Sequence, residues 1–178
     1  KRCHSDNYVN HPSNVCDKDT TMCSEWLRAT TYVEWFWKQD WVGSSVDKDL
    51  WPQYLEEVMG TSLPKKHYSP ASCMLVSPHV NGILNMNKGK GSDTLTGTTR
   101  TPSKKFKASC RELGGVIVNL GTFLTEEEAH LAWATHKVNY IKTKVNPIQK
   151  DERIPLVLNK WCETTLANAN KLVAGLST

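Results

Sequence analysis

The sequence predicts an α+β fold, and three observations support this class. Apolar and aromatic residues recur at helical spacing over residues 24–39. Two runs within residues 106–123 have the patterns of strands and are separated by the turn signal Gly114-Gly115. A helix start follows at once, because Thr125 and Glu128 form a capping box. Helical and strand patterns in separate stretches of one chain favour this class.

The first half of the chain is expected to contain short elements joined by loops. Ser24 suits the N-cap of the first helix, and Pro78 suits the first turn of a later helix, since proline needs no backbone partner there. The expected segments are irregular structure over residues 1–20, a helix over 24–39, a short strand ending at 47–50, a loop to 66, a second strand or extended turn over 70–76 and a helix over 78–84.

The second half begins with a stretch rich in Asn, Gly, Ser, Thr and Lys, residues 85–103, which is typical of a flexible linker. The segments expected after it are strands over 106–110 and 116–123, a helix that begins after Thr125 and ends at Asn146-Pro147, and a last helix from about 155 to 174. The helix after Thr125 places a set of side chains on one face for burial. They are Ala129, Ala132, Trp133, His136 and Tyr140.

Charge is distributed unevenly along the chain. The formal net charge is only +4, which permits nucleic-acid binding without requiring it. Between Lys88 and Arg111, however, seven basic residues stand against a single acid, Asp93, whereas residues 25–57 lean acidic. This asymmetry predicts a basic face on one module. The sequence has no signal peptide and no apolar run long enough to cross a bilayer, which favours a reducing cytoplasm.

Six cysteines are scattered along the chain without close pairing. In a reducing compartment most of them are expected to be buried thiols. A zinc site built from Cys3, Cys16 and Cys23 with a nearby histidine is the alternative, although no C-x-x-C pair supports it.

One stretch of the chain carries the pattern of a nuclease site. Asp47-Lys48-Asp49-Leu50 is followed by Tyr68-Ser69-Pro70, then by Cys73 and Val76, and finally by Asn81. This spacing resembles the ββα-metal finger of HNH nucleases in its bacteriophage form, with one member exchanged. The resemblance implies that Asp47 and Asn81 hold one Mg²⁺ or similar divalent cation on the scissile phosphate. It also implies that Lys48 stands where the family has the histidine that activates water.

The exchanged position leaves the identity of the general base open. A lysine ammonium has a reference pKa of about 10.4 and is a poor base unless it is strongly desolvated. In one interpretation Lys48 contacts phosphate while His67 or His79 serves as the base. In a second interpretation Asp49 has that role, and in a third the site is inactive.

A second resemblance covers residues 95–140. The chain reads Lys105-Phe106-Lys107-Ala108, then Leu120-Gly121-Thr122-Phe123-Leu124-Thr125-Glu126-Glu127-Glu128-Ala129, with Ala132-Trp133 following. This segment is similar to the plant APETALA2/ethylene-response DNA-binding domain. The resemblance implies three antiparallel strands backed by one helix, with the sheet laid into the major groove of double-stranded DNA.

Basic side chains of this module are the expected DNA contacts, with arginine suited to base edges and lysine to phosphates. They are Arg100 on the first strand, Lys104, Lys105 and Lys107 on the second, Arg111 at the turn, and Lys88 and Lys90 ahead of the sheet.

Together the two segments resemble the mobile homing endonucleases of bacteriophages. The resemblance implies a nuclease region at 1–86, a linker at 87–99, a DNA-binding domain at 100–146 and a helical extension at 147–178, in the cytoplasm of an infected bacterial host. The expected activity is metal-dependent cleavage of DNA. One alternative is an inactive relative that binds nucleic acid or serves as a subunit of a larger assembly. Another is an interaction protein that docks a partner through its last helix and Trp161.

Overall fold

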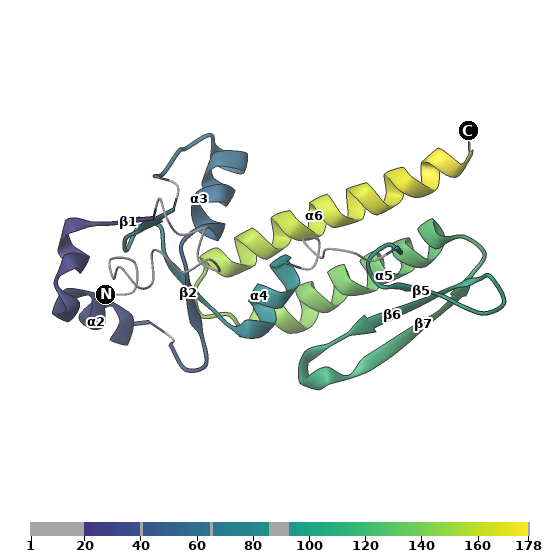
Figure 1. Ribbon diagram of the computed structural model, residues 1–178, viewed down its shortest axis with the longest axis horizontal. Helices are drawn as coiled ribbons and strands as arrows, with labels where there is room; N and C mark the ends of the chain where they lie inside the picture. The colour runs from purple at the N-terminus through teal and green to yellow at the C-terminus, as the bar shows by residue number, and fades with distance from the viewer. Residues whose placement is uncertain (1–19, 40, 65, 86–92, 178) are drawn as a thin grey trace. The chain divides into compact units, whose positions relative to one another are not determined.

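The computed structural model describes residues 20–39, 41–64, 66–85 and 93–177 (Figure 1). The chain divides into two compact units, Lys1–Ser77 and Pro78–Thr178, named here the N-terminal unit and the C-terminal unit. The expected α+β class is confirmed, since helices, two-stranded sheets and a three-stranded antiparallel sheet all occur. No helix of the described residues has the length and the apolar character needed to span a membrane. The irregular N-terminal stretch lies outside the described residues, apart from Thr20.

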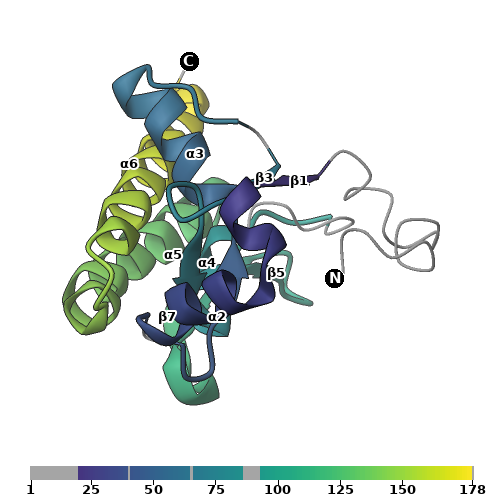
Figure 2. The ribbon, with the colours of Figure 1, turned by 90° about the vertical axis from the view of Figure 1, so that its left-hand side faces the viewer.

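The N-terminal unit consists of short elements. In chain order they are β1 (Thr21–Met22), a 3₁₀ turn (Ser24–Leu27), α2 (Ala29–Trp37), β2 (Ser45–Asp47), α3 (Leu50–Tyr54) with a π-helical turn (Leu55–Met59), β3 (His67–Tyr68) and β4 (Met74–Val76). β1 pairs in parallel with β3, and Figure 2 shows the two side by side. β2 pairs antiparallel with β4, so that Asp47 lies opposite Met74.

The helix expected over residues 24–39 is split into two pieces. Arg28 adopts an extended conformation (φ −88°, ψ 120°) between the 3₁₀ turn and α2. The expected N-cap is also wrong, because Ser24 is already the first residue of the 3₁₀ turn. Cys23 precedes that turn, and its side chain makes no capping hydrogen bond.

The loop expected to run to Lys66 instead contains α3. Leu50, Trp51 and Tyr54 recur at helical spacing in this segment. The carboxylate of Asp47 accepts hydrogen bonds from backbone N–H groups at the start of this helix. A helix as short as α3 depends on such local support, because its nucleation is unfavourable.

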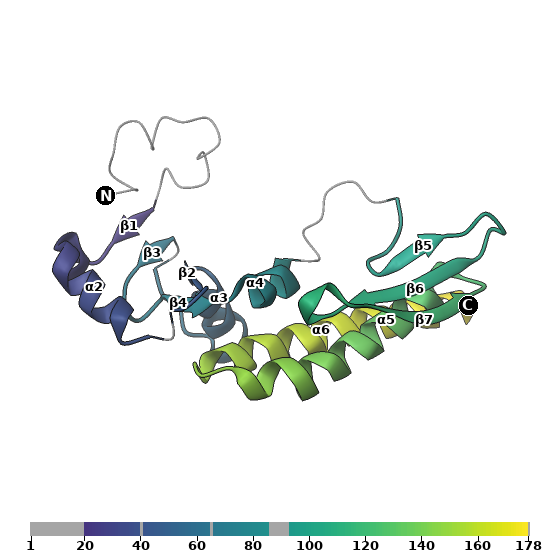
Figure 3. The same ribbon diagram turned by 90° about the horizontal axis from the view of Figure 1, so that it is seen from below.

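The C-terminal unit is built on one sheet and two long helices. Its elements are α4 (Pro78–Asn85), β5 (Thr98–Arg100), β6 (Phe106–Arg111), a 3₁₀ turn (Leu113–Gly115), β7 (Ile117–Phe123), α5 (Glu126–Tyr140), a π-helical turn (Ile141–Val145), a 3₁₀ turn (Asn146–Ile148), α6 (Arg153–Ala174) and a last 3₁₀ turn (Gly175–Ser177). The strand order is β5-β6-β7, antiparallel throughout. Helix α5 covers one face of the sheet, and α6 packs along α5 (Figures 1 and 3).

Helix α5 begins as the sequence predicts. The Thr125 hydroxyl accepts the backbone N–H of Glu128, and the Glu128 carboxylate accepts the backbone N–H of Thr125, both at 3.2 Å. The residues expected on its inner face are confirmed as buried or half-buried. Ala129, Trp133 and Tyr140 are buried, and Ala132 and His136 are half-buried.

The sheet has two different faces because side chains alternate along its strands. Ala108 and Cys110 of β6 are buried on the side of α5, so Lys107, Ser109 and Arg111 lie on the opposite side. We call that side the outer face. By pairing register its members are Thr99, Lys107, Ser109, Arg111, Ile117, Asn119 and Thr122.

A β-bulge interrupts the pairing of β6 with β7. Ala108 pairs with Gly121 and Ser109 with Asn119, so Leu120 is an extra residue in β7. The bulge divides the outer face into two halves along β6.

Trp133 lies at the centre of the C-terminal core. Its side chain is 1% exposed, stacks on His130 with centroids 5.3 Å apart and meets Trp161 of α6 edge-on at 6.5 Å. Gly97, just before β5, lies so close to the indole that an added Cβ would be 2.0 Å from Trp133 Cγ. Gly97 also has a φ of +82°, which residues with a side chain rarely adopt.

We expect Gly97→Ala to lower the free energy of unfolding by more than about 2 kcal/mol, because the positive φ and the indole both exclude a methyl group. Urea unfolding measures this loss. Gly82→Ala is the matched control: Gly82 lies in α4, an added Cβ there meets nothing in the described structure within 4 Å, and alanine favours a helix by about 1 kcal/mol. Equal stability of Gly97→Ala and the wild type would contradict this packing.

Candidate functional site

Asp47 ends β2, and its carboxylate caps the helix that follows. Oδ1 accepts hydrogen bonds from the backbone N–H groups of Asp49 (2.9 Å) and Leu50 (2.8 Å). No described residue donates a hydrogen bond to Oδ2, and Asp47 is half-buried. The fold therefore holds the carboxylate in one orientation and leaves its second oxygen able to accept a ligand.

Lys48, at the position of the expected base, is engaged by neighbouring side chains. Its Nζ lies 2.8 Å from Oδ2 of Asp49 and 5.6 Å from the centre of the Tyr68 ring. The side chain of Lys48 is only 11% exposed, whereas that of Asp49 is 57% exposed. In this ion pair Lys48 is an ammonium, which has no lone pair to accept a proton. The pair also occupies one oxygen of Asp49, the second candidate base.

His67 lies on β3 of the same unit. Its Nδ1 is 2.8 Å from the hydroxyl of Thr21, across the parallel pair of β1 and β3. This contact fixes the orientation of a half-buried ring. Nε2 has no hydrogen-bond partner among the described residues, so His67 keeps one nitrogen for proton transfer.

His79 belongs to α4 of the C-terminal unit. Its Nε2 is 3.0 Å from the Tyr140 hydroxyl, which accepts the backbone N–H of Leu113 at 2.8 Å. The hydroxyl keeps one hydrogen and one lone pair after it accepts the Leu113 N–H, so it can bond to either tautomer of a neutral imidazole. Burial lowers the pKa of His79, and the nearby Lys137 lowers it further. His79 is thus a packing partner of α5 within this unit.

Asn81, the second expected metal ligand, is held by its own helix. The side-chain amide of Asn85 donates to Oδ1 of Asn81 at 2.6 Å and to its backbone carbonyl at 2.9 Å. Asp47 belongs to the N-terminal unit and Asn81 to the C-terminal unit. That these two residues share a cation stays a prediction.

Residue types that commonly bind metals do not cluster in the described part of the chain. No group of three or more His, Cys, Asp or Glu side chains there is arranged to hold a metal ion. Cys3 and Cys16 of the alternative zinc site lie outside the described residues, while Cys23 is a half-buried free thiol. The zinc alternative also stays a prediction.

Two of the expected DNA-contacting residues share the outer face. Lys107 and Arg111 are both exposed there. Arg111 is the last residue of β6, whereas the sequence placed it at the turn. Lys88 and Lys90 lie outside the described residues.

The other three basic residues lie elsewhere. Lys104 and Lys105 were expected on the second strand but belong to the exposed turn before it, where Lys104 has a left-handed backbone (φ +62°). Arg100 is on β5 as expected, but it pairs with Phe106 and so belongs by register to the α5 side of the sheet. The outer face therefore carries fewer cations than the sequence indicated.

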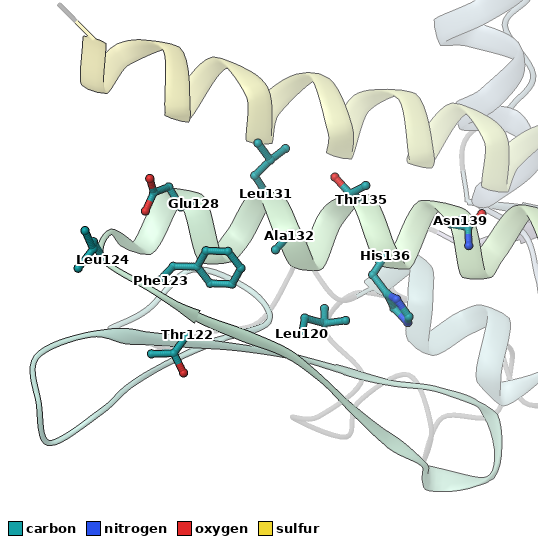
Figure 4. A pocket seen from close by; sticks show the side chains of 10 residues that line it. All are labelled: Leu120, Thr122, Phe123, Leu124, Glu128, Leu131, Ala132, Thr135, His136 and Asn139. Atoms are coloured by element: carbon teal, nitrogen blue, oxygen red, sulfur yellow. The ribbon is translucent and has the colours of Figure 1, made fainter.

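A groove between β7 and α5 was not indicated by the sequence (Figure 4). It has a volume of about 870 Å³ and is mainly apolar. Its lining residues are Leu120, Thr122, Phe123, Leu124, Glu128, Leu131, Ala132, Thr135, His136 and Asn139. His136 is bonded through Nε2 to the carboxylate of Glu112 at 2.8 Å.

Sequence reasoning also missed a buried lysine near the end of α5. Lys137 is 2% exposed, donates to the carbonyl of Arg111 at 3.1 Å and lies 5.1 Å from the centre of the Tyr140 ring. Burial lowers its pKa, an effect that a neighbouring thiol and carboxylate oppose. The sequence did indicate this burial, because Lys137 lies four residues after Trp133 and therefore on the same face of the helix.

Trp161, expected to be exposed if the last helix docks a partner, is half-buried and packs edge-on against Trp133 at 6.5 Å. This contact argues against docking through that side chain.

We expect acid to destabilise the protein partly through His79. The fold lowers the pKa of this imidazole below its ordinary 6.5, so the unfolded chain binds a proton that the folded chain does not. The contribution of neutral His79 to the free energy of unfolding is complete above the pKa that His79 has in the unfolded chain. It is lost as the pH falls through the lower pKa of His79 in the folded protein. His79→Gln, whose side-chain amide can also hydrogen-bond to the Tyr140 hydroxyl, should lose less stability than the wild type between about pH 7.5 and 5.

Urea unfolding at the two pH values checks this expectation, with His67→Gln as the control for loss of an imidazole elsewhere. A His79→Gln variant as acid-sensitive as the wild type would contradict the role of His79.

No protein-family model matches the chain, and no curated protein or solved structure matches it either. The HNH-like and APETALA2-like resemblances therefore rest on the residues of this chain alone.

Proposed function

We propose that this protein binds double-stranded DNA through the outer face of its sheet and cleaves it at an HNH-type site. The observation that carries the proposal is the exposed pair Lys107 and Arg111 on one strand of a helix-backed sheet. Strands lie about 4.8 Å apart, so three strands are about 10 Å across, and the major groove is about 12 Å wide. Such a sheet fits the groove with its outer face toward the bases.

The charge of the sheet segment favours a polyanionic partner. From Thr98 to Phe123 there are five basic residues and one acid, Glu112. The carboxylate of Glu112 bonds to His136 of α5 at 2.8 Å, which directs it toward the helix. The residues opposite Lys107 on both neighbouring strands are threonines, too short to cover its ammonium.

The order of elements supports the nuclease half of the proposal. β2 and β4 form an antiparallel pair, and α4 begins two residues after β4 ends. This is the strand–strand–helix order of an HNH finger, with Asp47 at the end of the first strand. Asp47 and Asn81 would offer a carboxylate and an amide oxygen, the hard donors that suit Mg²⁺. A cation bound by these oxygens would supply charge stabilisation to the phosphate and to the leaving 3′-oxygen.

Water activation then falls to His67. Its Nε2 is not bonded to a described residue, whereas Asp49 is paired with Lys48 and His79 with Tyr140. An imidazole is suited to this role near neutral pH.

A second candidate function is DNA binding without cleavage. The ion pair of Lys48 with Asp49 at 2.8 Å favours it, because a protonated group occupies the position of the family's base.

We expect the double variant Lys107→Gln and Arg111→Gln to bind random-sequence duplex at least about tenfold more weakly. The slope of log affinity against log salt should fall by about 1, since each phosphate contact contributes about 0.9 and Lys107 is the phosphate contact of the pair. Fluorescence anisotropy of a labelled duplex over a salt series measures both quantities.

The matched control for this variant is Lys144→Gln with Lys171→Gln, which removes the same charge from exposed helical positions of the same unit. Equal losses in the two double variants would show that total charge, rather than the outer face, determines binding.

We expect the wild type with Mg²⁺ to nick supercoiled plasmid, and Asp47→Asn and Asn81→Ala each to slow nicking about 100-fold or more. Asparagine at position 47 keeps an oxygen that can accept the N–H of Leu50, so the cap of α3 persists. Glu163→Gln, an exposed carboxylate on α6, is the control. Gel electrophoresis of the plasmid forms gives the rates.

If both site variants still nick the plasmid at the wild-type rate, Asp47 and Asn81 are not the metal ligands. A wild type that binds duplex but never nicks it would select the second candidate function.

A further inference from the structure

The tip of the β6–β7 hairpin exposes three apolar side chains beside the proposed DNA-binding face. Leu113, Val116 and Ile117 are 57%, 58% and 62% exposed. Ile117 belongs to the outer face, directly opposite Arg111 in the β6–β7 register. Exposed apolar side chains gathered on one turn are typical of an interaction surface.

Helix α5 fixes this tip from the other side of the sheet. Three of its polar side chains bond to consecutive residues at the end of β6: Lys137 to the Arg111 carbonyl (3.1 Å), His136 to the Glu112 carboxylate (2.8 Å) and Tyr140 to the Leu113 N–H (2.8 Å). The turn itself closes through Gly114 and Gly115, with φ of +77° and +81°. A turn held in this way loses little conformational entropy when it binds.

We infer that this tip reads thymine. Ile117, flanked by Val116 and Leu113, contacts the C5-methyl groups of thymines in the major groove, next to the base pairs that Arg111 reaches. The methyl group of thymine is the apolar group that base pairs present in that groove, and aliphatic side chains recognise it. The inference rests on the proposed DNA binding and adds a source of sequence preference to it.

Charge decides in favour of DNA as the occupant of this surface. Lys107 and Arg111 are exposed on the same face as Ile117, and that face has no acidic member in the described sheet. The combination of aliphatic and cationic side chains suits a major groove, where methyl groups lie between lines of phosphates.

The test compares two duplexes that differ only in the methyl group. One is an alternating A·T duplex, and the other has uracil in place of every thymine. We expect the wild type to bind the thymine duplex more tightly, by about fourfold for each methyl group that it buries. Ile117→Ser should bind the two duplexes equally. Ile148→Ser is the matched control, because Ile148 is 65% exposed and lies outside the sheet, and it should keep the preference.

Equal binding of the two duplexes by the wild type would overturn the inference and leave the proposed DNA binding intact. Failure to bind any duplex would overturn both. A preference that survives in Ile117→Ser, with circular dichroism showing a folded protein, would place the methyl contact elsewhere and also overturn the inference. An unchanged preference with an altered sedimentation coefficient in Ile117→Ser would assign the tip to self-association instead.

Discussion

The arrangement of the C-terminal unit depends on the packing of the Trp133 indole. Gly97 lies against its ring with no space for a Cβ, so the backbone before β5 approaches α5 directly. On the helix side the indole stacks on His130, which in turn bonds to the carbonyl of Thr96 at 2.8 Å. The same indole meets Trp161 of α6. One side chain thus sets the separation of the sheet from α5 and the position of α6.

The outer face takes little part in the core, because α5 packs on the opposite side of the sheet and provides its apolar contacts there. Apolar residues of β6 pack on the helix, and Lys137 and Tyr140 satisfy backbone groups at the end of that strand. A buried ammonium is costly unless it is hydrogen-bonded, and the carbonyl of Arg111 offsets part of that cost. The side chains of Lys107 and Arg111 therefore carry little of the core's stability, and their identity can serve another purpose.

Features with one local cause were predictable from the sequence. The capping box at Thr125, the alternation along β6 and the apolar stripe of α6 each depend on residues within a few positions of one another. The split at Arg28 has no distinctive local pattern, whereas the start of α3 had one that was overlooked: Asp47 precedes residues at helical spacing and accepts the N–H groups of Asp49 and Leu50. The helical spacing of Lys137 from Trp133 indicated the buried face, but the carbonyl that accepts from its ammonium belongs to another element, and nothing in the sequence pattern indicates that partner. For the nuclease-like site, the motif named the residues but could not show that Lys48 is ion-paired, since that contact depends on side-chain conformation.

The bulge at Leu120 has a consequence for the shape of the sheet. One extra residue in β7 increases the local right-handed twist, so the two halves of the outer face are rotated relative to each other. A flat surface touches a helical groove over a short length, whereas a surface that twists can follow its curvature for longer. If the sheet binds in the major groove, the twist that Leu120 introduces determines how many successive base pairs the outer face can reach.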